Sequence, residues 1–136
     1  MLNAQALWQL FAPIASKYVQ ELDLRLLEVR ASEVVLALPV APALVHGGGV
    51  LCGQAILSAA DTAMVLALFA HFGESRRCTT VQLQTSFLRA VPGDAGEVRV
   101  IGRVLKCGRS LAFGEIEVLG ADGQLAAHAT TTYALL

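Results

Sequence analysis

Asp61 is the most isolated charge in this chain of 136 residues. Between Glu33 and Glu74 no other residue bears a formal charge at neutral pH, and most side chains around Asp61 are apolar. An ionised carboxylate in such surroundings costs several kcal/mol unless hydrogen bonds or water compensate. Carboxylates kept there act as general bases or nucleophiles, and the structural alternative is an aspartate that caps a loop or pairs across an interface. We therefore predict that Asp61 is a catalytic carboxylate that acts as a general base or as a nucleophile.

A second group of candidate residues precedes the same apolar segment. His46 is followed by Gly47, Gly48 and Gly49, and Gly53 comes four residues later. Glycines leave backbone N–H groups open to a ligand, and the start of a helix favours negative charge. This arrangement suits an oxyanion that forms on a carbonyl. The chain has no GxSxG motif, which excludes a serine nucleophile elbow, and its glycines do not match GxGxxG.

The hydrophobic spacing predicts the elements that position these residues. The expected order is a helix (residues 2–16), two strands (22–29 and 34–38), a loop (41–50), a long buried helix (51–72) and four strands (81–87, 98–104, 110–119 and 125–135). Pro13 weakens the first helix, and a slip of phase at Leu27 indicates a bulge. The order predicts an α+β fold, in which one antiparallel sheet wraps around a long central helix, with a further helix at the N-terminus.

Composition narrows the functional classes. One domain over residues 1–136 is expected, and a hydrophobic share of 55% with 15% charged residues suggests that part of the apolar surface lies in subunit interfaces. A net charge of -1 without basic runs argues against nucleic acid as a partner. Asp61 in mid-helix would cost roughly 2.5 to 3.5 kcal/mol in a membrane, so we expect no membrane span. The N-terminal segment does not resemble a signal peptide, which favours a cytoplasmic protein.

The three cysteines give no sign of a disulfide framework or a metal site. Cys52, Cys78 and Cys107 are odd in number, without CxxC spacing and without a matching histidine cluster. A thiolate nucleophile at Cys52 is conceivable because helix N-termini lower thiol pKa values, but a small cysteine that fills space is the simpler interpretation. We expect no metal.

The segment CGQAILSAADTA, residues 52–63, resembles the HGG-to-DTA signature of hotdog-fold acyl-CoA thioesterases of the phenylacetate-pathway type. The similarity continues through TVQLQTSFLR, residues 80–89, and GRSLAF, residues 108–113, and covers roughly residues 18–135. The resemblance implies a hotdog fold and hydrolysis of an acyl- or aryl-acyl-CoA thioester. Coenzyme A would then be part of the substrate, and no further cofactor is implied.

The resemblance also implies roles for single residues. Asp61 corresponds to the carboxylate that activates water or attacks the carbonyl, and Gly53 to the glycine whose N–H polarises the thioester oxygen. Thr80 corresponds to a hydroxyl that helps to hold the water. Cys52 departs from the histidine usual at its position, and His46 stands where some relatives have an asparagine. His46 either donates a hydrogen bond near the thioester or is a loop histidine without a task.

Further residues are expected to contact the substrate. Cys52, Gln54 and Ser58 surround the start of the helix, and Ser58, one turn before Asp61, could orient it or simply pack. The phosphates of coenzyme A need surface cations, for which the candidates are Arg89, Arg103, Lys106 and Arg109. We assign only Arg109 to this role, because ordinary solvated charges explain the others equally well.

The spacing of Gly53 and Asp61 has a consequence for assembly. Eight residues of helix separate them by about 12 Å, which is too far for both to touch one carbonyl. The site should therefore combine Gly53 and His46 of one subunit with Asp61 and Thr80 of another. We expect a homodimer at least, and a tetramer built from two dimers.

Two other functions stay open from the sequence. One is an acyl-CoA-binding or regulatory module that uses the same tunnel without chemistry. The other is a hydratase or dehydratase, which is weaker because Leu66 stands where the expected histidine, five residues after Asp61, would be.

Overall fold

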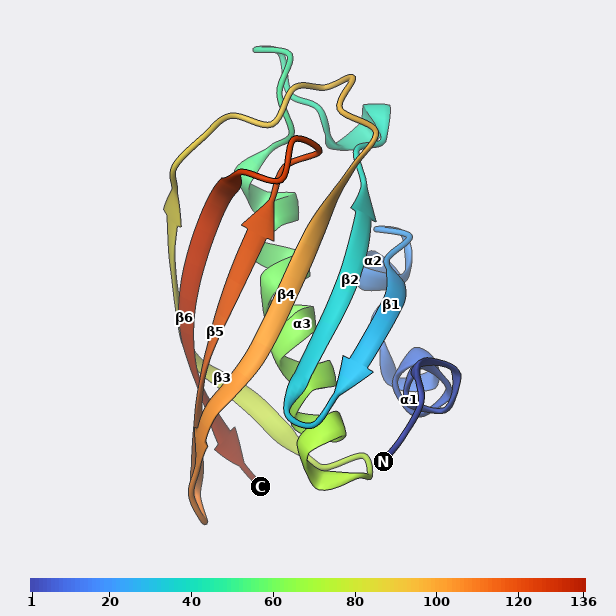
Figure 1. Cartoon of the computed structure of the whole chain (residues 1–136), viewed down its shortest axis with the longest axis vertical. Helices are drawn as coiled ribbons and strands as arrows, with labels where there is room; N and C mark the ends of the chain where they lie inside the picture. Colours follow the sequence, from blue (N-terminus) through green and yellow to red (C-terminus); the bar gives the residue numbers. More distant parts are fainter.

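A computed structural model describes the whole chain, residues 1–136, as one six-stranded antiparallel sheet curved around a single long helix (Figure 1). The order of strands across the sheet is β1-β2-β4-β5-β6-β3. Their bounds are Arg25–Arg30 (β1), Glu33–Pro39 (β2), Cys78–Phe87 (β3), Glu97–Cys107 (β4), Leu111–Leu119 (β5) and Leu125–Leu135 (β6). The α+β architecture predicted from the spacing is therefore confirmed. Strand β3 lies at one edge of the sheet, and its outer side pairs with no other strand.

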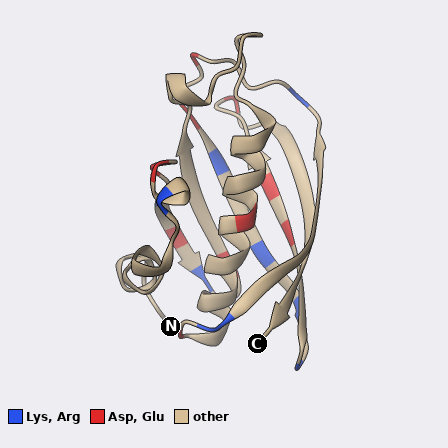
Figure 2. Cartoon of the chain, turned by 180° about the vertical axis from the view of Figure 1, so that it is seen from behind, with Lys and Arg blue, Asp and Glu red and all other residues tan.

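The long helix α3 (Gly53–Phe72) fills the hollow of the sheet, as Figure 2 shows from behind. Its alanines, leucines and other good helix formers are buried on almost every face. Although α3 is long and apolar enough to span a membrane by length and composition, 67% of that apolar window is buried inside the fold. Gly73 ends the helix in a left-handed conformation, with φ 73°, and its N–H donates to the carbonyl of Phe69.

Two glycines of the sheet let α3 come close. A Cβ atom on Gly102 of β4 would lie 2.9 Å from the carbonyl oxygen of Ala63 and 3.0 Å from its Cβ. A Cβ atom on Gly114 of β5 would collide with the side chain of Met64 and lie 2.7 Å from the carbonyl oxygen of Arg103. The sheet and the helix are therefore in direct contact at Ala63 and Met64, close to Asp61 in the helix, which fixes the position of Asp61 along the strands.

The N-terminal helix is shorter than predicted. Instead of one helix over residues 2–16, α1 (Ala4–Phe11) is followed by a 3₁₀ turn, η1 (Ala12–Ile14), and by α2 (Lys17–Gln20). Pro13 cannot donate a hydrogen bond within an α-helix, so the prediction was wrong for the second half of the segment. Asn3 and Ser16 cap the two helices with their side-chain oxygens.

The strands begin and end close to the expected positions. The bulge between Leu26 and Glu28 is where the slip of phase at Leu27 predicted it. Strand β1 starts only at Arg25, because Asp23 adopts a left-handed conformation with φ 58° and turns the chain just before it. A tight turn at Gly123 joins β5 to β6, and the Ala-Asp-Gly sequence of residues 121–123 is typical of such a hairpin.

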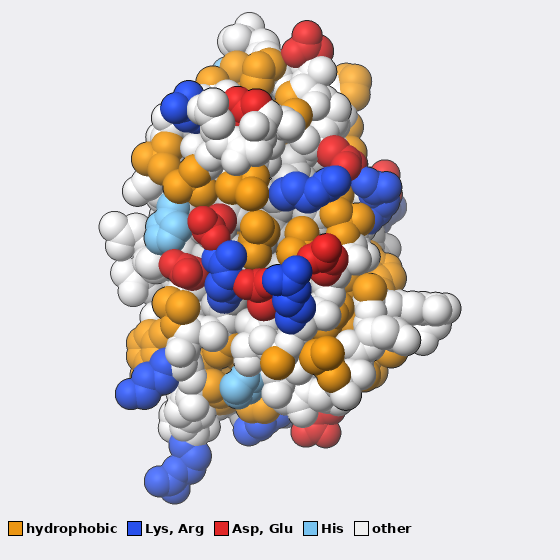
Figure 3. All heavy atoms as spheres, viewed as in Figure 1, with side chains coloured by type: hydrophobic (Ala, Val, Ile, Leu, Met, Phe, Trp, Pro, Cys, Tyr) orange, Lys and Arg blue, Asp and Glu red, His pale blue; other side chains and the backbone are white.

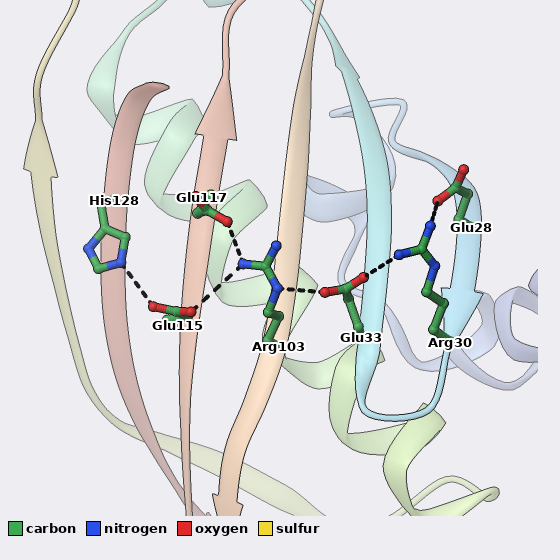
Figure 4. Close-up of polar contacts among 7 residues, drawn as sticks. All are labelled: Glu28, Arg30, Glu33, Arg103, Glu115, Glu117 and His128. Carbon is green, nitrogen blue, oxygen red and sulfur yellow. Dashed lines mark hydrogen bonds and ion pairs between the residues drawn. The ribbon is translucent and has the colours of Figure 1, made fainter. Parts of the chain in front are cut away.

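The outer face of the sheet carries a row of alternating charges, which crosses the middle of the surface in Figure 3. Arg103 of β4 is its centre and contacts Glu33 on one side and Glu115 and Glu117 on the other (Figure 4). Glu28 and Arg30 extend the row to β1, and His128 extends it to β6. The residues of this charged row are Glu28, Arg30, Glu33, Arg103, Glu115, Glu117 and His128. Burial would lower the pKa of Arg103, but its hydrogen bond to Glu117, the largest influence, raises it.

Candidate functional site

Asp61 lies in the middle of α3, partly buried, and two hydroxyl groups converge on its carboxylate. Thr80 of β3 donates to Asp61 Oδ1 at 2.8 Å, and Tyr133 of β6 donates to the same oxygen at 2.5 Å. The hydroxyl of Tyr133 also lies 3.0 Å from the backbone carbonyl oxygen of Asp61. Thr80 and Tyr133 face each other in the register of β3 and β6, so one pair of strands supplies both donors. The predicted grouping of Asp61 with Thr80 is present within a single chain.

The surroundings of this carboxylate keep its neighbours protonated. Burial is the main cause that raises the pKa of Tyr133 above its usual range, and the hydrogen bond to Asp61 adds to it. Burial also raises the pKa of the Cys78 thiol, with a smaller contribution from the charge of Asp61. Tyr133 therefore remains a phenol and a hydrogen-bond donor at neutral pH.

A groove of about 480 Å³ opens beside Asp61, between the N-terminal segment and α3. Its walls are mainly apolar and include Phe11, Val65 and Phe69, and the segment that joins α3 to β3 adds Arg76 and Arg77. Asp61 is the only acidic residue that lines it. The groove can therefore hold an apolar group directly against the carboxylate.

Gly53 is the first residue of α3, and its N–H donates to no acceptor within the chain. It lies in a second, separate groove, lined in part by Phe87 and Arg89 and not by Asp61. A Cβ atom at Gly53 would lie 3.3 Å from the ring of Phe87, so the backbone is closely covered on that side. Within one chain, then, Gly53 and Asp61 do not face the same space.

The glycine run before α3 does not present the row of free N–H groups that the sequence suggested. Gly48 N–H donates to Nδ1 of His46 at 2.8 Å, and Gly49 N–H donates to the carbonyl of His46. Gly47 and Gly53 keep N–H groups that donate to no acceptor within the chain, and of these two only Gly53 lies at the start of α3, so it is the candidate donor. Because Nδ1 of His46 accepts, the proton of the neutral ring is on Nε2, where it can be donated outward from this exposed loop.

The remaining predicted contacts are distributed around the helix start. Cys52 is partly buried and precedes the helix without capping it, and Gln54 is exposed. Ser58 donates to the carbonyl of Gln54 at 2.8 Å and contacts the hydroxyl of Tyr18 at 2.9 Å. It does not bond to Asp61, so the suggestion that Ser58 orients the carboxylate was wrong. The roles of these residues toward a substrate stay predictions.

The candidate cations for the phosphates, of which only Arg109 was assigned to this role, differ in whether carboxylates already bind them. Arg103 is held by three carboxylates in the charged row and is not available to a ligand. Arg109 is exposed in the β4–β5 hairpin and makes no ion pair. The backbone carbonyl of Ser110, next to Arg109, accepts a hydrogen bond from the N–H of Leu135, and the carbonyl of Arg77 accepts one from the N–H of Leu136. Arg77 and Arg109 therefore lie at the same end of the molecule.

Tyr133 is the residue that sequence reasoning missed. The alternation of β6 places it on the inward face together with Ala127, Ala129 and Thr131, which marks it only as a core residue. Its partner Asp61 is 72 positions away in the chain, and the pairing of β6 with β3 that brings them together is a tertiary property. A tyrosine buried on a strand without a local acceptor was the only available signal.

Comparison with known proteins places this geometry in a family. Residues 48–127, more than half of the chain, match the thioesterase superfamily. The chain belongs to the thioesterase superfamily. A relative from Saccharolobus solfataricus, provisionally named an esterase, is 30% identical over 122 residues, which are 90% of this chain and 85% of that protein.

Solved structures of similar proteins share the whole fold. A conserved protein from Pseudomonas aeruginosa superposes with a TM-score of 0.83 at 33% identity, over 92% of this chain and 98% of that one. The PaaI protein from the phenylacetic acid degradation operon of E. coli gives a TM-score of 0.83 at 18% identity, over 98% and 95% of the two chains. The hotdog fold is thus confirmed, the solved structures that share it include this PaaI protein, and membership of the thioesterase superfamily suggests a hydrolase.

Proposed function

We propose that this member of the thioesterase superfamily hydrolyses the thioester bond of an acyl- or aryl-acyl-CoA. The observation that carries the proposal is the carboxylate of Asp61, held by two hydroxyls on the wall of an apolar groove. Asp61 takes a proton from a water molecule whose oxygen attacks the carbonyl carbon. The C–S bond then breaks, and the thiolate of coenzyme A leaves and takes up the proton, which yields a carboxylic acid and a thiol.

The acyl group fits the groove between the N-terminal segment and α3. Apolar side chains such as Phe11, Val65 and Phe69 surround the space next to Asp61, whereas the pantetheine arm, rich in amides, would be poorly matched there. The polar remainder of coenzyme A would then extend over the surface. Arg109, exposed and without an ion pair, is suited to its phosphates.

The oxyanion of the tetrahedral intermediate needs a donor that the same chain does not bring to Asp61. Gly53 has a free N–H at the positive end of α3, but about 12 Å of helix separates it from Asp61. A second subunit supplies the missing half. His46, which can donate through Nε2, lies in the loop that precedes Gly53 and would enter the site with it.

The unpaired edge of β3 offers a way to build that dimer. Asp61 contacts Thr80 near one end of β3, and Gly53 lies against Phe87 at the other end. Two copies of β3 paired antiparallel about a two-fold axis near their middle would place Thr80 of one subunit opposite Phe87 of the other. Asp61 and Gly53 of different subunits would then meet. Val81 and Phe87, 60% and 51% exposed in the single chain, would be covered.

The direct test is release of free thiol from a small panel of aromatic, branched and straight-chain acyl-CoA compounds. Asp61→Asn should lower kcat by about 10²-fold or more, because the amide cannot accept the proton, while the oligomer seen by gel filtration is unchanged. Asp94→Asn, the same change on an exposed loop carboxylate, is the matched control and should turn over normally.

Two results would contradict the proposal. Near-normal hydrolysis by the Asp61→Asn protein would remove Asp61 from the chemistry. Tight binding of an acyl-CoA by the wild-type protein without any release of thiol would favour the non-catalytic, acyl-CoA-binding alternative.

A further inference from the structure

Both hydrogen bonds to the Asp61 carboxylate go to one of its two oxygens. Tyr133 and Thr80 donate to Oδ1 at 2.5 Å and 2.8 Å, and no side chain or backbone group of the chain donates to Oδ2. Tyr133 also reaches the backbone carbonyl oxygen of the same residue at 3.0 Å. One phenol therefore ties the side chain of Asp61 to its own backbone and fixes the direction in which the carboxylate faces.

We propose that Tyr133 is a positioning residue that anchors Oδ1 and thereby makes Oδ2 the reacting oxygen. The proposal rests on the function proposed above. It also stands on packing: Tyr133 is only 2% exposed, lies opposite Thr80 on the neighbouring strand and is directed at α3 across the sheet. Its ring is held by the core, so the hydroxyl is a fixed reference point for the carboxylate.

The phenol is suited to this task because it keeps its proton. A hydroxyl has one hydrogen to donate, and the carboxylate of Asp61 is a stronger acceptor than the backbone carbonyl beside it. Buried next to this negative charge, Tyr133 has a pKa raised above its usual range. It can therefore stabilise the ionised carboxylate without competing with Asp61 for the proton of the reacting water.

The geometry also defines what Thr80 can do. Its single hydroxyl hydrogen is directed at Oδ1, so toward a water molecule Thr80 can only accept. A water that donates one hydrogen to Thr80 Oγ1 and the other to Asp61 Oδ2 keeps a lone pair free for the carbonyl carbon. On attack, the hydrogen directed at Oδ2 is the one that transfers, and it later passes to the departing thiolate.

The test is Tyr133→Phe, which removes the hydroxyl and keeps the ring. A hydrogen bond to a charged group contributes enough that kcat should fall about 10- to 100-fold, with KM for the acyl-CoA changed less than about threefold. Thr131→Val is the matched control, since it removes another buried hydroxyl from the inward face of β6, one that donates to the carbonyl of Gln82. It should lower the melting temperature slightly and leave kcat unchanged.

A second measurement needs no substrate. The carboxyl carbon of Asp61, assigned by comparison with the Asp61→Asn protein, can be titrated by ¹³C NMR. The groups that face Asp61 or share its groove are Tyr133 of β6, Thr80 and Cys78 of β3, and Arg76 and Arg77 before β3. In Tyr133→Phe only the first changes, and the titration should move to higher pH because the ionised form loses a donor.

The outcomes separate this proposal from the proposed function. An unchanged titration, or a loss of kcat that Thr131→Val reproduces together with an equal fall in melting temperature, would show that Tyr133 is merely structural. If the wild-type protein releases no thiol from any acyl-CoA, the proposed function fails, and the titration still decides whether Tyr133 anchors Asp61.

Discussion

Gly53 can be tested by a substitution that removes one hydrogen atom and leaves the helix in place. Proline has no N–H, and the first position of a helix is where it is best tolerated. Gly53 is that first residue, and its N–H donates to nothing within the chain, so Gly53→Pro breaks no existing hydrogen bond. Cys52 before it has φ -69° and ψ 148°, the extended conformation that a residue before proline requires.

A matched control separates the lost N–H from added bulk. Gly53→Ala places a Cβ 3.3 Å from the ring of Phe87, just as proline does, but keeps the N–H. The 3.3 Å contact with the ring of Phe87 is relieved by a shift of a few tenths of an ångström, and both substitutions require that same shift. Any difference between the two variants then reports on the N–H, and not on this contact.

The expected difference is large. Loss of one donor to an oxyanion costs about 10² to 10³ in kcat, about 3 to 4 kcal/mol of transition-state stabilisation. We therefore expect Gly53→Pro to lie at least 100-fold below Gly53→Ala in thiol release, and Gly53→Ala to stay within about threefold of wild type. Circular dichroism and gel filtration should show the same helix content and assembly for both. Equal kcat values in two well-folded variants would refute the assignment of Gly53 as the oxyanion donor.

Two further predictions concern the proposed sharing of the site between subunits and the raised pKa values of Cys78 and Tyr133. If each site combines Gly53 of one subunit with Asp61 of the other, inactive Asp61→Asn and Gly53→Pro chains refolded together in equal amounts should regain about a quarter of wild-type activity. Half of the dimers are then mixed, and each mixed dimer has one intact site out of two. A mixture as inactive as its parents would mean that the site lies within one chain. The pKa values of Cys78 and Tyr133 are raised from 9.0 and 10.0, so the folded chain keeps protons that the unfolded chain releases, and the free energy of unfolding should fall as pH rises above about 9. Urea unfolding at a series of pH values tests this, with a shallower fall expected for Tyr133→Phe, and a flat profile between pH 8 and 11 would contradict it.

The parts of the fold that depend on neighbours in sequence could be predicted. Helix α3 follows from an apolar stretch of twenty residues that is rich in good helix formers, and the bulge at Leu27 follows from a slip in an alternating pattern. The N-terminal helix was predicted too long, because the apolar spacing continues past Pro13 although the backbone cannot. Spacing records which face is buried, and it does not record where hydrogen bonds stop.

The site divides in the same way. The isolated charge of Asp61 and its separation from Gly53 by eight residues of helix could be seen in the sequence, whereas the completion of the site by Gly53 of another chain stays a prediction. The hydrogen bonds from the Gly48 and Gly49 N–H groups to His46 could not be predicted, because the conformation of a loop depends on contacts that an alternating pattern does not encode.

The sequence by itself determined the carboxylate, the helix that carries it and the strands that enclose it, since each of these depends on residue type and local period. The tertiary structure decided which oxygen of Asp61 is held and by what. That depends on the register between β3 and β6, which places Thr80 and Tyr133 opposite each other beneath α3. Hydrogen bonds between residues so far apart in the chain arise only when the sheet closes around the helix, and no local pattern specifies them.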